Sequence, residues 1–413
     1  MIKFIHTADI HYGVENYGRI DARTGIHSRL LDFHKALNFC IDTALKEEVD
    51  FFLFSGDAYK TTNPSPTQQK LLMESFFRLY AKNIPIIIII GNHDNPLSFG
   101  KATSLDVFNN LPVDGFHVIA KPQTIHLTTK NGPVNIVGIP WPTRNNVTLS
   151  QEHTYKSATD ITEYLSQAVG NIITQMAAQL DPTIPAVLAS HLTVSSGIFS
   201  GSEKRAVYGN DPCLLPSQLA IKPFDYVALG HLHRYQDLNN DGYPSVVYSG
   251  SPERVDFGER KEDKGFCLVS IPEKNKATHQ FIKTPTRPFI QIDVKLSTDE
   301  ALDQTEQILS AIQEHDIKNA VLKIVYHVPS NLKSKVDLKT VQRACDSAMF
   351  VVGIIPVCKP VAREKRGNLS VDMKLETLLD LYFEEKPALK THKKELIKKA
   401  LELAEQNKEQ EKL

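Results

Sequence analysis

The sequence predicts an α/β protein in which helices pack on a β-sheet, followed by a smaller α/β unit and a helical tail. Short apolar runs alternate with longer segments of helical spacing over the first two thirds of the chain. Five consecutive isoleucines, Ile86 to Ile90, indicate a strand that is buried on both faces, because β-branched side chains pack well on a pleated surface. Two prolines in the polar stretch 283–288 indicate a linker, after which the pattern becomes more compact.

The first region should form closely spaced strands and helices. Segment 28–47 has apolar residues at helical spacing, and segment 67–82 follows Pro66, which suits the start of a helix. The remaining apolar runs are too short for helices and indicate strands. We expect these strands at 2–7, 50–54, 86–90, 135–139, 186–189, 225–229, 245–248 and 265–270.

The region after the linker predicts a β-α-β-α-β unit of about 75 residues, which is near the minimum size for independent folding. Its helices should cover 298–314, with Asp299 and Glu300 in the first turn, and 336–347. Its strands should cover 289–296, 321–328 and 350–357. Two further helices, 372–385 and 389–407, are separated by Pro387, and each carries an apolar stripe. We therefore divide the chain into units 1–283, 284–360 and 361–413.

The overall charge excludes a generally basic nucleic-acid-binding protein. The chain has 47 Lys and Arg residues against 48 Asp and Glu residues, a net charge of −1, so any DNA-binding surface must be a local patch. Five cysteines without a CxxC pair indicate a reducing compartment. The chain starts directly in a strand-like segment and has no apolar run long enough to span a bilayer, so we expect a cytoplasmic protein.

Five short polar motifs follow predicted strands, and their residue types indicate chemistry. In an α/β sheet, residues just beyond the carboxyl ends of the strands converge on one edge, where ligands bind. Asp, His and Asn side chains are ligands for manganese, iron or zinc. The motifs are Asp9-Ile10-His11, Gly56-Asp57, Gly91-Asn92-His93-Asp94, Ser190-His191 and Gly230-His231-Leu232-His233.

The spacing within two of these motifs suggests paired ligands. Asp9 and His11 are two residues apart, as are His231 and His233. In an extended backbone such residues point to the same side, so each pair could face one metal or two adjacent metals. The glycines would let the chain turn sharply as it leaves each strand.

Each motif alone has a more ordinary interpretation. An Asp-X-His triplet is usually a set of surface polar residues, and Gly-Asp is common in turns. A lone histidine such as His191 is usually a hydrogen-bonded core residue. The conjunction of five motifs in this order, each at a strand end, favours a metal site over these interpretations.

The set resembles the calcineurin-like metallophosphoesterase superfamily, whose pattern is DxH, GD, GNH[DE], a lone His and GHxH. Several stretches resemble more closely the SbcD nucleases, the bacterial members of the meiotic-recombination-eleven family. This resemblance covers residues 1 to about 275 well, the small unit by position and pattern, and the tail hardly at all. The stretches are 5–11, 91–94, 190–191, 228–233, Ser249-Gly250-Ser251-Pro252-Glu253-Arg254, Gly258-Glu259 and Lys264-Gly265-Phe266. Lys60 departs from the family, which often has an acidic residue there, and this puts substrate contacts near that loop in doubt.

The resemblance implies a sandwich of two β-sheets flanked by helices, with a small α/β capping domain and a helical tail. It also implies two divalent metal ions, with Mn²⁺ as the first choice, although the ligand types admit zinc or iron. One metal would be held by Asp9, His11 and His233, the other by Asn92, His191 and His231, and Asp57 would bridge both. His93 would act as a general acid or as a hydrogen-bond donor to the phosphate, and Asp94 would orient the loop.

The function implied is that of a DNA exonuclease and endonuclease subunit. Such a subunit hydrolyses phosphodiester bonds by a two-metal mechanism and works with an SbcC-like, SMC-type ATPase in DNA end processing, repair, recombination and replication. The tail helices 372–407 would either dock on the coiled-coil base of that ATPase or fold back on their own chain. The family also forms homodimers through its nuclease domain. Candidate phosphate contacts are Lys204, Arg205, Arg254, Arg260, Lys261 and the basic run 359–366.

Two other functions compete with this one. A phosphatase or cyclic-nucleotide phosphodiesterase of the same superfamily would act on a small molecule, but would need neither the 249–254 stretch, the second domain nor the tail. A non-catalytic scaffold is disfavoured because every expected metal ligand and His93 are present.

Overall fold

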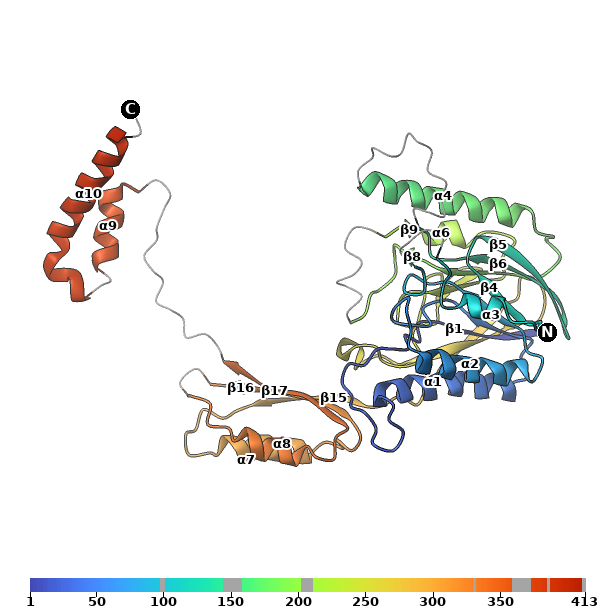
Figure 1. The fold of residues 1–413 in the computed structure, drawn as a ribbon, viewed down its shortest axis with the longest axis horizontal. Coiled ribbons are helices and arrows are strands. Elements are labelled where there is room, and N and C mark those ends of the chain that lie inside the picture. Colours follow the sequence, from blue (N-terminus) through green and yellow to red (C-terminus); the bar gives the residue numbers. More distant parts are fainter. Residues whose placement is uncertain are drawn as a thin grey trace.

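Two six-stranded sheets form the larger part of the molecule. The computed structural model describes residues 1–96, 101–143, 158–201, 211–329, 332–358, 373–384 and 387–410. Figure 1 shows the two sheets stacked between helices. The first has the order β14-β13-β1-β2-β3-β4 and the second the order β11-β12-β10-β7-β6-β5. The first comprises β1 (Ile2–Thr7), β2 (Phe51–Phe54), β3 (Ile86–Ile89), β4 (Phe116–Ile119), β13 (Gly265–Ile271) and β14 (Thr278–Lys283). The second comprises β5 (Gln123–Thr129), β6 (Gly132–Ile139), β7 (Ala186–His191), β10 (Tyr226–Gly230), β11 (Gln236–Asp237) and β12 (Ser245–Tyr248).

The isoleucine strand β3 shows how these layers are built. Ile86 and Ile88 point into the core beneath helices α1 (Ser28–Lys46) and α2 (Pro66–Tyr80). Ile87 and Ile89 point into the core between the two sheets, because side chains alternate along a strand. All four isoleucines of the strand are fully buried, which confirms the prediction of a strand covered on both faces.

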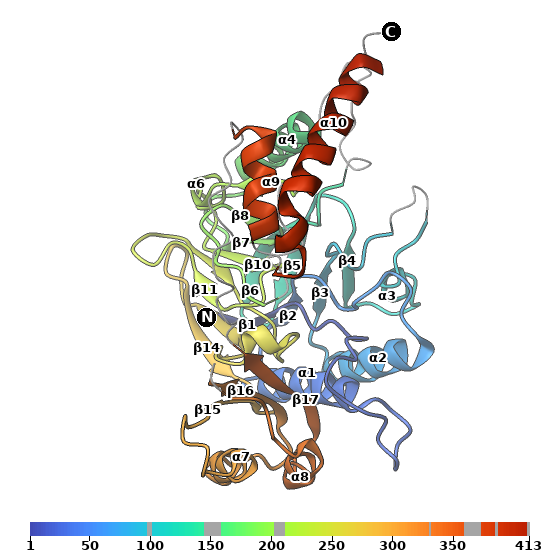
Figure 2. The ribbon, with the colours of Figure 1, turned by 90° about the vertical axis from the view of Figure 1, so that its left-hand side faces the viewer.

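The second sheet is covered on its outer face by α4 (Ala158–Ala178) and the short α6 (Pro216–Leu219). Figures 1 and 2 both place α4 on the side away from α1 and α2. The expected sandwich of two sheets flanked by helices is therefore confirmed. A parallel two-residue pair, β8 (Thr193–Val194) and β9 (Cys213–Leu214), and the short α3 (Asp106–Asn109) complete this region.

The small unit has the predicted β-α-β-α-β order. Strands β15 (Phe289–Lys295), β16 (Val321–Val328) and β17 (Phe350–Cys358) form a parallel sheet, and α7 (Gln304–Gln313) and α8 (Leu338–Ala344) contribute to its core. The prediction that the first helix starts near residue 298 was wrong. Asp303 accepts hydrogen bonds from the backbone N–H groups of Thr305 and Glu306 and caps the helix, which begins at Gln304, six residues later than expected.

A buried ion-pair network, which we call the junction, ties the linker to α1. The guanidinium of Arg287 donates from Nε and NH2 to the carboxylate of Asp32, at 2.7 and 2.6 Å. It also donates to the carbonyl of Asn319 in the small unit, at 2.7 Å. Arg29, almost fully buried, donates to the same Asp32 carboxylate at 2.8 Å. The stretch predicted as a polar linker is thus anchored by several charged hydrogen bonds.

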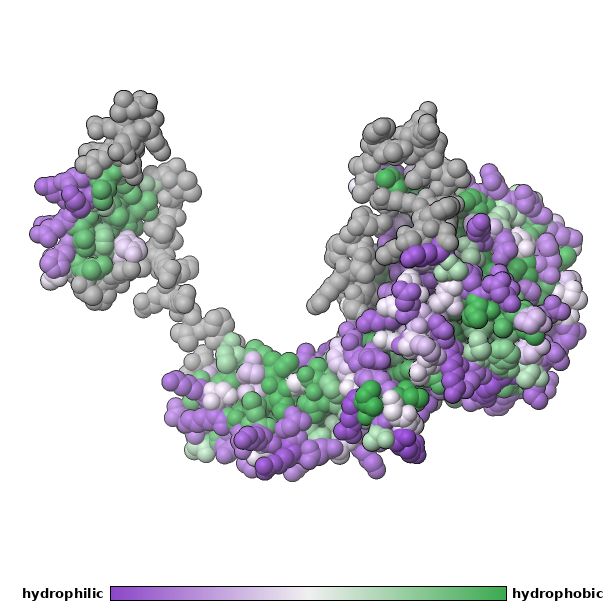
Figure 3. All heavy atoms as spheres, in the orientation of Figure 1, coloured by the Kyte–Doolittle hydropathy of each residue, from purple (hydrophilic) through white to green (hydrophobic). Residues whose placement is uncertain are grey.

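The tail forms a helical hairpin of α9 (Leu375–Glu384), the 3-10 helix η3 (Pro387–His392) and α10 (Lys393–Gln410). Lys393 Nζ lies 2.8 Å from the Asp380 carboxylate and links the two helices. Figure 3 shows hydrophobic side chains gathered on the hairpin and along the small sheet, where Ile355 and Val357 are exposed. The second tail helix begins later than predicted, because η3 occupies the residues just after Pro387.

Two simpler findings bear on the sequence predictions. All five cysteines are free thiols. Among the described residues, every helix falls short of the length or apolar character that crossing a membrane requires.

Candidate metal centre

The predicted side chains meet at one edge of the sandwich. Strands β1, β2 and β3 run parallel, as do β7 and β10, so their carboxyl ends lie on the same side of their sheets. Each predicted motif starts within or just after one of these ends. The motif residues are Asp9 and His11 after β1, Asp57 after β2, Asn92, His93 and Asp94 after β3, His191 ending β7, and His231 and His233 after β10.

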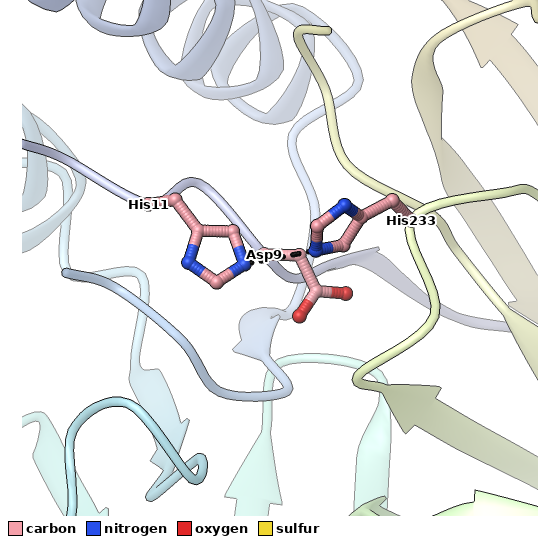
Figure 4. Close-up of side chains that lie close together, drawn as sticks. All are labelled: Asp9, His11 and His233. Carbon is pink, nitrogen blue, oxygen red and sulfur yellow. Dashed lines mark hydrogen bonds between the residues drawn. The ribbon is translucent and has the colours of Figure 1, made fainter. Parts of the chain in front are cut away.

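The first expected ligand group is close together. Asp9, His11 and His233 are buried, and each offers a ligand atom within 4.8 Å of the others. The Nε2 atoms of His11 and His233 face each other at 3.0 Å (Figure 4). The Asp9 carboxylate accepts a hydrogen bond from the backbone N–H of His231, which fixes its position at the base of the site.

The second expected group surrounds the side-chain oxygen of Asn92. His191 Nε2 lies 2.9 Å from Asn92 Oδ1, and His231 Nδ1 lies 3.2 Å from the same oxygen. His231 Nε2 is buried and has no hydrogen-bond partner among the described residues. The Asp211 carboxylate lies 3.9 Å from this Nε2, whereas Nδ1 is the nitrogen of His231 that faces Asn92.

Asp57 lies between the two groups, where the resemblance places a bridging ligand. Its Oδ2 is 3.6 Å from His11 Nε2 in the first group and 3.4 Å from His191 Nε2 in the second. Its Oδ1 accepts a hydrogen bond from the backbone N–H of His93 at 2.9 Å. The same oxygen of Asp57, Oδ2, therefore faces a histidine of each ligand group.

The backbone at these residues is not the extended chain that the spacing argument assumed. Asp9, His11, Asp57 and His231 have φ angles of +56°, +47°, +59° and +107°, in the left-handed region that non-glycine residues rarely adopt. The pairs therefore converge through tight turns rather than through strand alternation. Left-handed residues of this kind concentrate at functional sites, where surrounding contacts hold the strain.

Two of the motif glycines are required for space. A Cβ atom at Gly91 would lie 2.1 Å from Asp57 Oδ1, and a Cβ atom at Gly230 would lie 2.0 Å from the carbonyl oxygen of Ser55. Gly56, with a φ angle of +98°, has the backbone conformation that the prediction of a sharp turn relied on, whereas Gly91 and Gly230 have no positive φ angle. They let neighbouring strands approach each other at the site.

Asp94 holds the loop that carries Asp57. Its buried carboxylate accepts hydrogen bonds from the backbone N–H groups of Asp57, Ala58, Tyr59 and Gly91, at 2.8, 3.0, 3.2 and 3.1 Å. Burial and the nearby Asp57 charge raise the pKa of Asp94 to about 6. This geometry matches the loop-orienting role that the resemblance implies for Asp94.

Charge is unevenly distributed over the site. Burial raises the pKa of Asp9 to about 7 and lowers the pKa of His231 to about 3. Burial also opposes charge on Asp57 and His191, but their mutual attraction outweighs it. The pKa of Asp57 therefore falls below its usual range, and that of His191 rises to about 9. A divalent cation bound at His191 would compete with a proton on its imidazole, so cation binding should release protons.

The outer hydrogen bonds of the histidines fix which nitrogen faces the site. His191 Nδ1 lies 2.8 Å from the carbonyl of Ser55, and His233 Nδ1 lies 2.9 Å from the carboxylate of Glu259. Both partners are acceptors, so each Nδ1 carries the proton and each Nε2 faces the ligand groups. Such outer partners are typical of metal-binding histidines, so the donor set fits two divalent cations.

His93 is an exposed residue of the site, with its ring centroid 5.0 Å from that of His11. Its Nδ1 donates to the backbone carbonyl of Lys60 at 2.8 Å, which leaves Nε2 as the nitrogen available to a substrate. Position 60 therefore contributes through its backbone, and the change from an acidic residue to lysine leaves this contact possible.

Sequence reasoning missed two residues beside the site. Trp141, the only tryptophan in the chain, has ring centroids 4.9 Å from His231 and 6.0 Å from His191. Its position after a strand, between two prolines, was the available signal. Glu259 lies in the Gly258-Glu259 stretch that carries part of the resemblance, but the sequence indicated no role for it.

The predicted DNA contacts are only partly described. Lys204, Arg205 and the basic run 359–366 lie outside the described residues. The Arg254 guanidinium donates to the carbonyls of Glu262 and Arg287, at 3.0 and 3.2 Å, and to Thr286, so it forms part of the junction. A DNA contact at Arg254 stays a prediction.

The comparison with known proteins identifies the family. A family model described as calcineurin-like phosphoesterase matches residues 2–235, more than half of the chain. Two similar solved structures are a dimetal phosphatase from Danio rerio, with 11% identity and a TM-score of 0.39, and the protein TT1561 of Thermus thermophilus, with 12% identity and a TM-score of 0.37. Each match covers 68% of this chain and 98% of the other. By its family-model match, the chain belongs to the calcineurin-like phosphoesterases, which are metal-dependent hydrolases.

Proposed function

We propose that this protein is a two-metal DNA phosphodiesterase, a nuclease subunit of the SbcD type. The observation that carries the proposal is the position of Asp57, which has an oxygen within 3.6 Å of His11 and 3.4 Å of His191. Asp9, His11 and His233 would hold one cation, and Asn92, His191 and His231 the other. Two such cations activate a water molecule and stabilise charge on the phosphate during in-line displacement.

The protein residues have separate tasks in this proposal. The Asp57 carboxylate would reduce the repulsion between two cations and fix their separation. His93, with its Nδ1 bonded to the Lys60 carbonyl, would present Nε2 to the phosphate or to the leaving oxygen. A proton donor in that position typically contributes about 10²–10⁴-fold to the rate.

DNA is favoured over a small phosphoester by what surrounds the site. The 249–254 stretch resembles the nuclease branch, and in this structure it connects the site to the junction. Ser251 donates its backbone N–H to the carbonyl of His233 at 3.0 Å, while Arg254 donates to the carbonyl of Arg287. A hydrolase of small molecules needs no second domain attached to its site in this way.

The remaining parts of the proposal follow the resemblance. Manganese would be the metal, and the 372–407 helices would bind an SbcC-like ATPase. Their apolar side chains include the exposed Leu375, Tyr382 and Leu403, which suit a helical partner. A homodimer through the nuclease domain completes the assembly that we propose.

The test compares cleavage of DNA with hydrolysis of small esters. Linear double-stranded DNA and a single-stranded circle are incubated with the protein and Mn²⁺, in parallel with p-nitrophenyl phosphate and a bis-nitrophenyl diester. His93→Ala should lose DNA cleavage, whereas His315→Ala should keep it. His315 is a matched control, because it is also exposed and its Nδ1 also donates to a backbone carbonyl at 2.8 Å.

Two outcomes separate the proposal from its alternatives. DNA cleavage that disappears in His93→Ala and persists in His315→Ala supports the nuclease and the role of His93. Hydrolysis of the small esters with intact DNA contradicts the nuclease and favours a phosphatase or phosphodiesterase of the same family.

A further inference from the structure

The short 3-10 helix η2 (Phe257–Glu259) lies between the metal centre and the small unit. One end of η2 contacts the candidate ligand His233, and the other end contacts β15 and β16. η2 has only three residues, so its two contacts lie within two positions of each other along the chain.

Glu259 forms the contact with the metal centre. Its fully buried carboxylate accepts hydrogen bonds from His233 Nδ1 at 2.9 Å and from the backbone N–H of Val255 at 2.9 Å, and it pairs with Lys264 Nζ at 2.7 Å. All three partners are donors, so a carboxylate fits this position and an amide does not. Lys264 Nζ also donates to the carbonyl of His233, at 2.8 Å.

Phe257 forms the contact with the small unit. Its ring centroid lies 5.6 Å from that of Phe289, the first residue of β15. Phe257, Phe289 and Val321 form a small buried cluster of their own. The ammonium group of Lys323 in β16 lies 5.7 Å from the centre of the Phe257 ring.

The segment between these two contacts has little room to move. The backbone N–H of Gly258 donates to the side chain of Asp256 at 2.7 Å. A Cβ atom at Gly258 would lie 2.7 Å from the Cα atom of Gly201. Closely packed segments transmit displacements instead of absorbing them. A movement of Phe289 would therefore shift the Glu259 carboxylate and the imidazole bonded to it.

We propose that Glu259 is a positioning residue for His233, and that the small unit fixes Glu259 through Phe257. Cation affinity at the group of Asp9, His11 and His233 then depends on how the small unit is docked. By linkage, a cation bound there favours the docked small unit to the same extent. This inference rests on the proposed metal centre and adds a regulator to it.

Calorimetric titration of the metal-free protein with Mn²⁺ tests the inference without measuring catalysis. Glu259→Gln should weaken binding by about 10–100-fold, the usual effect of losing an outer partner of a ligand histidine. Phe289→Ala, a change in the small unit, should weaken binding in the same direction and by less. Phe116→Ala should bind as wild type does, because Phe116 opens β4 at the opposite end of the strands from the site.

The Phe116 control is matched to the test residue. Phe116, Phe257 and Phe289 are each 7% exposed. Phe116→Ala and Phe289→Ala therefore each remove a similarly buried aromatic ring. Thermal unfolding without metal verifies that each variant is folded. If Phe289→Ala binds Mn²⁺ as tightly as Phe116→Ala does, the inferred link is overturned and the metal centre stands. If the wild-type protein binds no Mn²⁺, Zn²⁺ or Fe²⁺, the metal centre is itself overturned, and the link with it.

Discussion

The junction predicts that Asp32→Asn will release the small unit from the rest of the protein. Asp32 accepts two charged hydrogen bonds from Arg287 and one from Arg29. An asparagine keeps one acceptor oxygen but turns an NH2 group towards guanidinium donors. Arg287 would then lose its ion-pair partner, and Arg29 would keep only the Glu253 carboxylate, 3.8 Å away.

The magnitude follows from burial. The side chains of Asp32 and Arg287 are 5% and 15% exposed, so the pair is largely shielded from water. Breaking a buried pair by changing one partner costs about 3–5 kcal/mol. At 1.4 kcal/mol per factor of ten, this is roughly a 100- to 4,000-fold change in the docking equilibrium. This loss of free energy weakens the docking of the small unit, because Arg287 also donates to Asn319 in that unit.

Limited digestion with trypsin measures this release. The Lys283–Thr284 bond lies at the junction, where the backbone N–H of Thr284 donates to the carbonyl of Lys264 at 2.9 Å. Cleavage there should be much faster in Asp32→Asn, and mass spectrometry of the fragments identifies the bond.

A second ion pair on the same helix provides the control. Asp42 pairs with Arg78, but their side chains are 59% and 41% exposed, so Asp42→Asn should change stability by less than about 1 kcal/mol. Equal rates of cleavage at Lys283 in Asp32→Asn and Asp42→Asn would refute the reasoning that the junction holds the small unit.

Two further predictions concern the site and the core. Mn²⁺ added to the metal-free protein should change the fluorescence of Trp141, because the Trp141 ring lies 4.9 Å from that of His231. Asp57→Asn should weaken this change in fluorescence. An unchanged spectrum in the wild-type protein would contradict a cation at His231. His6 donates to the carbonyl of Leu229 and accepts from Tyr226, and burial lowers its pKa to about 3. In the unfolded chain His6 is therefore protonated below about pH 6.5, whereas in the folded chain it stays neutral down to about pH 3. As the pH falls from about 6.5 to about 3, the free energy of unfolding should decrease by up to about 5 kcal/mol. His6→Gln should flatten this part of the stability curve measured by urea unfolding, and an equally steep curve would show that His6 is not the cause.

Elements with strong local signals were predictable from the sequence. Helix α2 begins at Pro66 after a capping box between Ser65 and Gln68, and strand β3 consists of isoleucine alone.

Helix α4 was not predicted, although it is long. Its sequence includes Gly170 and several β-branched residues, which lower helix propensity. Packing against the second sheet, through residues such as Val169 and Ile173, supplies the stability that local propensity does not.

The site was predictable in composition but not in conformation. The motifs identified which residues meet, because strand topology brings their ends to one edge. They could not indicate left-handed turns at Asp9 and His11, which arise from contacts with the Gly56–Ala58 backbone of the neighbouring strand end. Nor could they connect Glu259 with His233, since these residues are 26 positions apart and meet only when the chain folds.

The two ligand groups are held by different parts of the protein. His191 and Asn92 belong to strand ends of the two sheets, and His191 is oriented by the Ser55 carbonyl at the end of β2. His233, by contrast, is contacted by Ser251, Glu259 and Lys264, all from the segment that also reaches the junction. Loosening the junction should therefore weaken the group of Asp9, His11 and His233 before the other. A two-site Mn²⁺ titration of Asp32→Asn would then show one weakened site and one unchanged site, whereas equal weakening of both would mean that the sheets themselves had been disturbed.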